Sequence, residues 1–175
     1  MTPNFERTHP ISIEDLENRA SSIRMLLLDV DGILTDGLLY LSNSGDEYKT
    51  FNTLDGQGIR IAISKQLQIG IITGRKSKIV SSRAAELGIK IVKQGCLDKE
   101  SALADISHET GIPYAEIAYA GDDVPDLPVL KKVGLSITVP KGHASAKAVS
   151  HTITSESGGA GAVREMIDFI LSKRE

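Results

Sequence analysis

Two aspartates stand two positions apart at the end of an apolar segment. Asp29 and Asp31 belong to the run DVDGILTDG, which follows the apolar residues 25–28. The two-residue period of a strand places both side chains on one face, at the strand's carboxyl end. Burying two like charges together is costly unless a cation compensates them, and a hard divalent ion with oxygen ligands is the simplest compensation. The alternative interpretation is a pair of solvated turn acids, because Asp-x-Asp is a common pattern.

A second acidic cluster follows another apolar segment, residues 117–120. Asp122 and Asp123 come after Gly121, and Asp126 lies three residues further along. Carboxylates from two strand ends can share one metal ion, and Mg²⁺ prefers oxygen ligands completed by water and a substrate phosphate. The two clusters together therefore predict Mg²⁺-dependent phosphoryl chemistry. A helix cap at Asp122 or Asp123 is the structural alternative, and it is compatible with a catalytic role.

Two further polar groups follow strand-like segments. Thr73-Gly74-Arg75 combines a hydroxyl, a close backbone approach at Gly74 and a helix N-terminus, which together favour an anion such as phosphate. A simple helix cap with a turn glycine is the alternative for Thr73 and Gly74. Lys99 opens a helical segment after residues 89–92, so it is a candidate to cross the mouth of the site, although a lone lysine is usually a solvated surface charge.

Short apolar segments alternate with longer amphipathic ones, which predicts an α/β fold with a doubly wound, Rossmann-like parallel sheet and helices on both faces. In such sheets, ligands bind at the carboxyl ends of the strands. The expected strands span residues 25–30, 67–72, 89–92, 117–120 and 134–139. The expected helices span residues 58–66, 76–87, 99–110, 124–133 and 160–173.

One segment departs from this alternation. Residues 38–41 and 47–51 flank an Asn/Ser/Gly/Asp turn, which predicts a β-hairpin flap over residues 38–51 after the first strand. Its apolar residues would need a partner surface. They are Leu39, Leu41, Tyr48 and Phe51. Residues 1–12 are expected to form a loosely held arm, and the Gly-rich loop at 158–161 is either a flexible turn or a contact toward a neighbouring subunit.

Composition narrows the class of protein. The chain has 175 residues, of which 41% are hydrophobic and 25% charged, so one domain over residues 1–175 is expected. A single cysteine excludes a disulfide framework and fits a reducing, cytoplasmic setting. The net charge of −3 gives no basic face for nucleic acid. No apolar run approaches the roughly 18 residues that a membrane-spanning helix needs, so no membrane partner is expected.

The ordered motifs resemble those of the haloacid dehalogenase-like phosphotransferases, over residues 24–170. The family has four motifs, and the segments of this chain that resemble them are, in order, residues 29–32, residues 73–75, Lys99 and residues 121–126. The resemblance implies that Asp29 is the nucleophile that forms an aspartyl-phosphate, and that Asp31 is the general acid and base. It also implies that Thr73 and Lys99 cover the phosphoryl oxygens. Mg²⁺ would be held by Asp29, the main-chain carbonyl of Asp31 and Asp122, with Asp123 orienting a ligand water.

Within this family, the chain resembles the branch that lacks a cap domain, because residues 37–71 have room only for a hairpin and a helix. Within that branch, the chain resembles phosphatases that act on 3-deoxy-D-manno-octulosonate 8-phosphate. This substrate is a small anionic sugar-acid phosphate used in lipopolysaccharide synthesis. The resemblance implies a homotetramer with active sites near the subunit interfaces. The implied substrate contacts are Asp31, Asn52, Thr53, Leu54, Asp55, Gly56, Arg60, Gly74, Arg75, Arg83 and Lys99. Arginine's planar fork suits the carboxylate and phosphate of such a substrate.

Three alternatives stay open at this point. The substrate could be a related nine-carbon ulosonate 9-phosphate, because related phosphatases share these motifs. A receiver-like signalling module would account for a phosphorylatable Asp29 and a lysine, but not for Asp31 or for the Thr73 and Asp122 motifs together. A non-catalytic scaffold is the third, although every motif residue is present.

Overall fold

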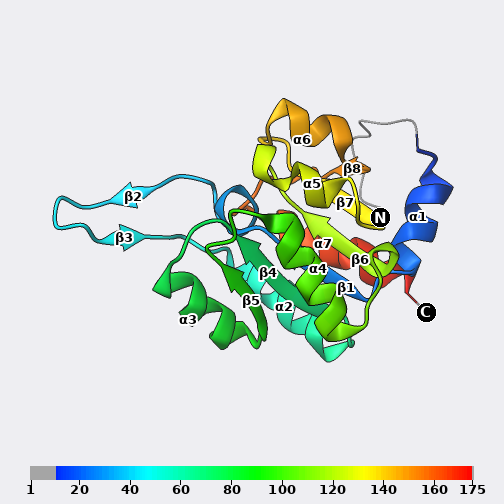
Figure 1. The fold of residues 1–175 in the computed structure, drawn as a ribbon, viewed down its shortest axis with the longest axis horizontal. Helices are drawn as coiled ribbons and strands as arrows, with labels where there is room; N and C mark the ends of the chain where they lie inside the picture. The colour runs from blue at the N-terminus through cyan, green and yellow to red at the C-terminus, as the bar shows by residue number, and fades with distance from the viewer. Residues whose placement is uncertain (1–10, 175) are drawn as a thin grey trace.

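The computed structural model describes residues 11–174, so residues 1–10 of the predicted arm lie outside the described part of the chain. Six parallel strands form one sheet in the order β5-β4-β1-β6-β7-β8 (Figure 1). The strands are β1 (Met25–Leu28), β4 (Gln68–Thr73), β5 (Ile91–Gln94), β6 (Ile117–Ala120), β7 (Leu135–Thr138) and β8 (Thr152–Ile153). The predicted α/β class with a parallel sheet is confirmed. The five predicted strands are present, and β8 was missed because it has only two residues.

Helices cover both faces of this sheet, as the alternation predicts (Figure 1). One face carries α1 (Ile13–Ser21), α2 (Thr53–Ser64), α3 (Lys78–Leu87) and α7 (Ala162–Lys173). The other carries α4 (Lys99–Thr110), α5 (Leu127–Leu130) and α6 (Ala144–Val149). Ser12, within the predicted arm, accepts a hydrogen bond from the Asp15 N–H and begins α1. No described helix is both long and apolar enough to span a bilayer.

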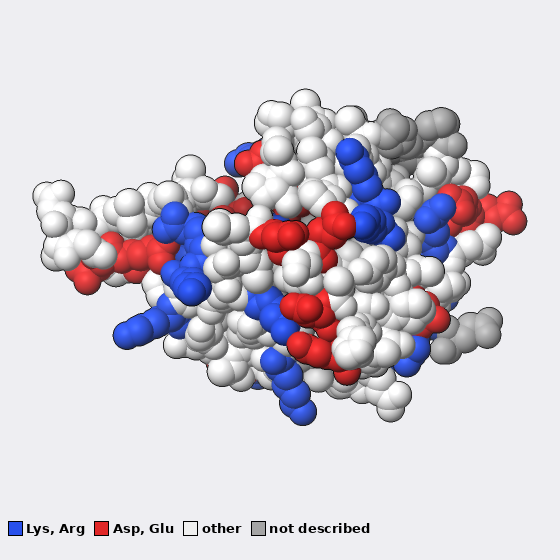
Figure 2. Space-filling view, viewed as in Figure 1, with Lys and Arg blue, Asp and Glu red and all other residues white. Residues whose placement is uncertain are grey.

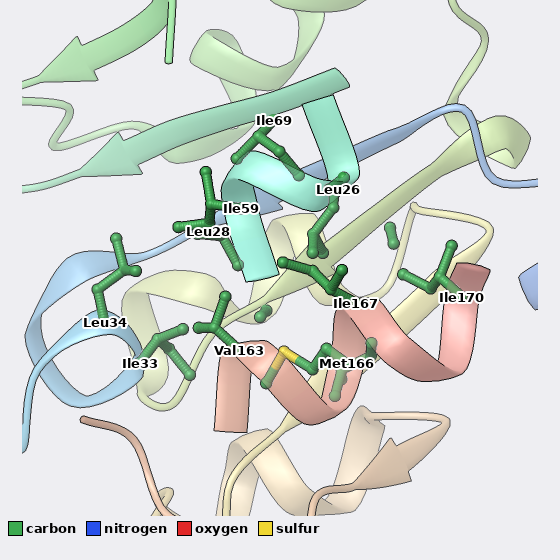
Figure 3. Packing of buried hydrophobic residues seen from close by; sticks show 14 of the residues in the cluster. Leu26, Leu28, Ile33, Leu34, Ile59, Ile69, Val163, Met166, Ile167 and Ile170 are labelled. Atoms are coloured by element: carbon green, nitrogen blue, oxygen red, sulfur yellow. The ribbon is translucent and has the colours of Figure 1, made fainter. Parts of the chain in front are cut away.

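Strand β1 is buried on both of its faces. Leu26 and Leu28 pack against Ile59 of α2 and Ile167 of α7 in one cluster, shown in Figure 3. The alternating residues of β1 belong to the cluster on the opposite face. An uninterrupted apolar run is typical of a central parallel strand, and its burial fixes the position where the chain leaves the sheet.

Two predicted helices have different bounds in the structure. Helix α2 begins at Thr53 rather than at residue 58, because Asn52 caps it and accepts a hydrogen bond from the Leu54 N–H at 2.7 Å. Gly56 and Gly58 lie in its first turns. An added Cβ would lie 2.4 Å from Arg83 at Gly56, and 2.9 Å from Arg164 at Gly58. The predicted helix over 124–133 is instead a short turn (Val124–Asp126) followed by α5, because its two prolines cannot donate backbone hydrogen bonds.

The predicted hairpin is present and projects from the body of the molecule (Figure 1). It pairs β2 (Tyr40–Leu41) with β3 (Glu47–Tyr48) in antiparallel register. Leu39, Leu41 and Tyr48 are exposed, as expected. Phe51 differs, because it packs against the core and lies 5.9 Å beneath the Arg83 guanidinium. The described residues place no cap domain after β1, only this hairpin and α2.

The direction in which successive strands are added to the sheet reverses between β1 and β6. The chain leaves β1 toward β4 on one side, whereas the later strands β6, β7 and β8 lie on the other. Connections that depart in opposite directions leave an opening at the carboxyl ends of the two central strands. Asp29 follows β1 and Gly121-Asp122 follows β6, so both acidic motifs lie at this opening.

The packing of α2 on the sheet and α7 gives a test of the fold. Ile59 is fully buried, so Ile59→Ala is expected to lower the free energy of unfolding by about 2–5 kcal/mol, through lost burial and a cavity. Ile63→Ala, on the more exposed side of the same helix, is expected to cost less than about 1 kcal/mol. Urea unfolding measures both, and equal losses would contradict the packing described.

Candidate active site

Asp29 is fixed by the backbone at the end of β1. Its N–H donates to the Ala120 carbonyl of β6 at 2.9 Å, and the residue is buried. The chain then turns through Val30–Leu34, where Gly32 adopts a φ of +97°. The Thr35 hydroxyl accepts from the Gly37 N–H at 3.2 Å and closes this loop. The sheet therefore sets the position of the first aspartate, and a loop that needs a glycine sets that of the second.

Lys99 joins the two acidic motifs. Its Nζ lies 2.9 Å from Asp29 Oδ1 and 2.6 Å from Asp126 Oδ1, and its side chain is only 5% exposed. The position at the first turn of α4 matches the prediction, but the side chain is buried inside the site rather than lying across its mouth. Burial lowers the pKa of Lys99, but the carboxylates of Asp29 and Asp126 outweigh it and raise that pKa, so the ammonium stays charged.

Asp126 organises the loop after β6. Its Oδ2 accepts from the backbone N–H groups of Asp122 at 3.0 Å and Asp123 at 3.1 Å, while its Oδ1 accepts from Lys99 and the Tyr119 hydroxyl. Sequence reasoning gave Asp126 no role of its own and missed Tyr119. The signal was available, because a tyrosine within a fully buried strand needs a partner for its hydroxyl.

Three carboxylates converge at the ends of β1 and β6. Oxygen atoms of Asp29, Asp122 and Asp126 lie within 4.8 Å of one another. Gly32 makes this approach possible, because a Cβ at that position would lie 2.1 Å from Asp122 Oδ2. Burial, opposed by Lys99, raises the pKa of Asp29 to about 6. Burial and the neighbouring charges of Asp29 and Asp126 raise the pKa of Asp122 to about 7.

Asp29 and Asp122 of this triad fit a hard divalent cation, because both oxygens of Asp126 already accept hydrogen bonds. Three carboxylates face one lysine, so ionisation of all four groups leaves an excess of negative charge in a largely buried site. Burial raises the pKa values of Asp29 and Asp122, and the neighbouring carboxylates raise them further. Carboxylate oxygens are the ligands that Mg²⁺ takes in proteins, and a cation would return both groups to their ionised form.

Asp123 and Asp31 lie outside the carboxylate triad. Asp123 is exposed, and its Oδ1 accepts from the Val124 N–H at 2.7 Å as a helix cap, so its side chain does not join the triad. Asp31 is partly buried, and its carboxylate pairs with Lys49 at the base of the hairpin. The sequence did not indicate this contact, because a single lysine in a hairpin strand has no local pattern that identifies its partner.

The second motif lies beside this site. Thr73 ends β4 and is 2% exposed, and its carbonyl accepts from the Cys96 N–H at 3.0 Å. Gly74 follows with open space around it, since an added Cβ would meet only the Cys96 carbonyl at 3.8 Å. Arg75 Nε lies 3.8 Å from Asp31 Oδ2. The structure therefore brings this motif to the same strand ends as Asp29.

The residues predicted to contact substrate at positions 52–56 include two with hydrogen-bond partners within the chain. Asn52 Nδ2 donates to the Gly159 carbonyl at 3.3 Å, and Asp55 Oδ1 accepts from the Arg164 N–H at 2.8 Å. Asp55 is 1% exposed and Gly56 is buried, whereas Thr53 and Leu54 are exposed. Within the described chain, Asn52 and Asp55 thus hold the start of α7, which sequence reasoning did not anticipate.

Two of the predicted arginines contact Glu86 of α3. Arg60 donates to the Glu86 carbonyl at 3.2 Å, and Arg83 pairs with the Glu86 carboxylate at 2.8 Å. The Arg60 contact joins α2 to the C-terminal end of α3, whereas the Arg83 pair lies within α3. The Arg60 side chain is 54% exposed, so its guanidinium is available on the surface of the subunit.

The Gly-rich loop packs on the Val30–Leu34 loop of its own chain. Gly159 donates to the Ile33 carbonyl at 3.1 Å, and a Cβ at Gly158 would lie 1.7 Å from the Gly32 carbonyl oxygen. Only a glycine allows this approach of two backbones. The loop therefore packs against residues 32–36. The sequence interpretations, a flexible turn or a contact toward a neighbouring subunit, did not include this packing.

The chain is similar in sequence to known phosphatases over most of its length. Residues 76–167 match the family described as haloacid dehalogenase-like hydrolase. The 3-deoxy-D-manno-octulosonate 8-phosphate phosphatase KdsC of Escherichia coli (strain K12) is 45% identical over 162 residues, which cover 93% of this chain and 86% of KdsC. The chain belongs to the haloacid dehalogenase-like hydrolases.

Solved structures of haloacid dehalogenase-like hydrolases share the fold. The 3-deoxy-D-manno-octulosonate 8-phosphate phosphatase of Moraxella catarrhalis, crystallised with a magnesium ion, a phosphate ion and KDO, is 40% identical with a TM-score of 0.91. The match covers 93% of this chain and 94% of that one. The cobalt-bound phosphatase YrbI of Haemophilus influenzae is 37% identical with a TM-score of 0.86, covering 89% and 91% of the two chains. The resemblance inferred from the ordered motifs is confirmed.

The raised pKa of Asp122 predicts how stability depends on pH. The folded-state value of about 7 exceeds the ordinary 3.8, so this group's contribution to stability is lost as pH rises between about 4 and 7. Without divalent cation, Asp122→Asn should therefore be more stable than wild type at pH 7.5, by on the order of 1–3 kcal/mol, and the difference should shrink by pH 4.5. Urea unfolding in a chelator measures this.

Added Mg²⁺ provides the control for that experiment. A cation that binds only the folded state stabilises it, so saturating Mg²⁺ should raise the unfolding free energy of wild type more than that of Asp122→Asn. Equal responses of the two proteins, or a variant less stable than wild type in chelator at pH 7.5, would contradict the acidic cation site.

Proposed function

We propose that the chain is a Mg²⁺-dependent phosphomonoesterase that hydrolyses 3-deoxy-D-manno-octulosonate 8-phosphate to the free sugar acid and phosphate. The observation that carries the proposal is the buried Asp29 carboxylate, held by Lys99 and facing Asp122 and Asp126. The relatives with this fold are phosphatases of that substrate, and one was crystallised with magnesium, phosphate and KDO.

In the first step, Asp29 acts as the nucleophile. A carboxylate oxygen of Asp29 forms a bond to phosphorus, and the ester bond between phosphorus and the sugar oxygen breaks. Asp31, two residues along on the same loop, gives its proton to the departing sugar oxygen. The fixed position of Asp29 at the end of β1 supports this role, because nucleophilic attack requires an oriented carboxylate.

In the second step, Asp31 acts as the base. Its carboxylate takes a proton from a water molecule, whose oxygen forms a bond to phosphorus as the bond to Asp29 breaks. Phosphate is released and Asp29 returns to its carboxylate form. Asp31 is 21% exposed at the side chain, compared with 9% for Asp29, so water has easier access to it.

Lys99 and Thr73 stabilise the transferring phosphoryl group in this proposal. The buried Lys99 ammonium offsets negative charge developing on the phosphoryl oxygens, and the Thr73 hydroxyl lies at the neighbouring strand end. Mg²⁺, when bound, would neutralise further charge on Asp29 and the phosphoryl oxygens. Its ligands would be Asp29, the Asp31 carbonyl and Asp122. Asp123 would orient a ligand water, for which its side chain would have to release the hydrogen bond from the Val124 N–H.

Substrate selection is assigned to arginines and to neighbouring subunits. Arg75 lies beside Asp31, where it can meet the sugar carboxylate, while Arg60 and Arg83 pair with Glu86 and remain partly exposed for a second subunit's site. The exposed apolar residues of the hairpin support a homotetramer with active sites near the interfaces. The single cysteine supports a cytoplasmic location.

The proposal predicts a narrow substrate preference. Phosphate release in the presence of Mg²⁺ from a panel of sugar-acid phosphates should give the highest kcat/KM for the octulosonate 8-phosphate. Asp29→Asn keeps the size of the side chain but removes the nucleophilic charge, so its kcat should fall by at least about a thousandfold. Lys65→Met, at an exposed position after α2, is the control and should match wild type.

Other results lead to different conclusions. A higher kcat/KM on a nine-carbon ulosonate 9-phosphate would transfer the assignment to that substrate. An aspartyl-phosphate that persists for minutes without turnover would favour the signalling alternative, and no turnover of any ester would favour the scaffold. Light scattering that shows a fully active monomer would contradict the tetramer.

A further inference from the structure

Lys49 occupies an unusual position for a hairpin residue. It directly follows β3 (Glu47–Tyr48), whose Tyr48 is 62% exposed, yet the Lys49 side chain is only 2% exposed. Its Nζ bonds to Asp31 Oδ1 and lies 3.5 Å from Glu47 Oε1. A buried ammonium group is costly unless it is paired, and both partners here are carboxylates at the base of the hairpin.

The surroundings of Asp31 make Lys49 its main partner. Arg75 lies 3.8 Å from the other Asp31 oxygen, but its side chain is 49% exposed and it bonds to Glu47 Oε1 at 2.9 Å. Lysine and arginine side chains gather where the hairpin meets the body of the molecule, as Figure 2 shows. Glu47 thus holds both cations in place, and Lys49 is the one that is buried and bonded directly to Asp31.

We propose that Lys49 is a positioning residue of the reaction, which holds the Asp31 carboxyl group in the orientation that proton transfer to the leaving group requires. The inference rests on the proposed function, in which Asp31 is the general acid. It gives the base of the hairpin a part in the chemistry, separate from any contact that the exposed tip makes.

A purely structural role for Lys49 is the competing interpretation. Anchoring the hairpin would require only that Lys49 pair with some carboxylate, and its loss would then slow all substrates alike. Buried ion pairs are weak stabilisers compared with apolar residues of similar size, so stability alone accounts poorly for a lysine at this position. The two roles differ in how activity depends on the leaving group.

The leaving group therefore provides the test. A good leaving group departs without a proton, whereas a poor one needs the acid, so loss of positioning should harm poor leaving groups more. Lys49→Met should lower kcat/KM about tenfold or more for alkyl and phenyl phosphates, but less than about threefold for p-nitrophenyl phosphate. Because kcat/KM covers only the steps through departure of the leaving group, the second step does not affect the comparison.

Three variants complete the measurement. Lys49→Arg keeps the charge and should retain the wild-type dependence on the leaving group, and Lys49→Gln, which keeps a donor, replaces Lys49→Met if that variant does not fold. In an Asp31→Asn background, Lys49→Met should cause less than about a twofold further loss, because the two residues act as one unit. Lys65→Met is the matched control at an exposed position.

Two results would overturn the inference. The first is an equal loss on all esters, which assigns Lys49 a structural role. The second is a loss that multiplies with that of Asp31→Asn, which assigns Lys49 an independent contact with the substrate. Failure of the proposed function is distinguishable, because wild type itself would then release no phosphate from any ester in the series.

Discussion

The ion pair between Lys99 and Asp29 is the interaction on which the rest of the site depends. Lys99 comes from the first turn of α4, Asp29 from the end of β1, and Asp126 from the loop after β6, so one buried ammonium group joins three elements that are distant in sequence. Its charge is insufficient for the three carboxylates that converge there. The site therefore carries an excess of negative charge, which disfavours ionisation of Asp29 and Asp122 until a cation binds.

The remaining features of the fold serve this arrangement. The sheet order reverses between β1 and β6, and the apolar residues of β1 hold Asp29 at this point. Glycines allow the close approaches that follow, with Gly32 beneath Asp122 and Gly158 against the backbone of Gly32. Helix α2 contributes through Asn52 and Asp55, which fix the start of α7 and the Gly-rich loop. The residues of the site thus lie on or next to elements that are packed on both sides, which holds them in place.

Much of this arrangement was predictable from the sequence because it follows local patterns. The apolar run of β1 and the alternation of segments indicated the sheet, and the acidic motifs at the two strand ends indicated the cation site. The contacts that depend on tertiary packing were not predictable. Neither the burial of Lys49 on Asp31 nor the Tyr119 hydroxyl on Asp126 has a local pattern, because each partner lies in another element. The structural partners of Asn52 and Asp55 were missed for the same reason, since α7 lies about a hundred residues away.

In the proposed reaction Asp29 attacks phosphorus, so each turnover proceeds through two displacements. The stereochemical course at phosphorus tests it most directly, using a phosphorothioate ester made chiral with two oxygen isotopes and hydrolysed in water that carries the third. Each in-line displacement inverts the configuration, so two displacements predict overall retention. Overall inversion would show that water attacks the ester directly, and it would contradict the role assigned to Asp29.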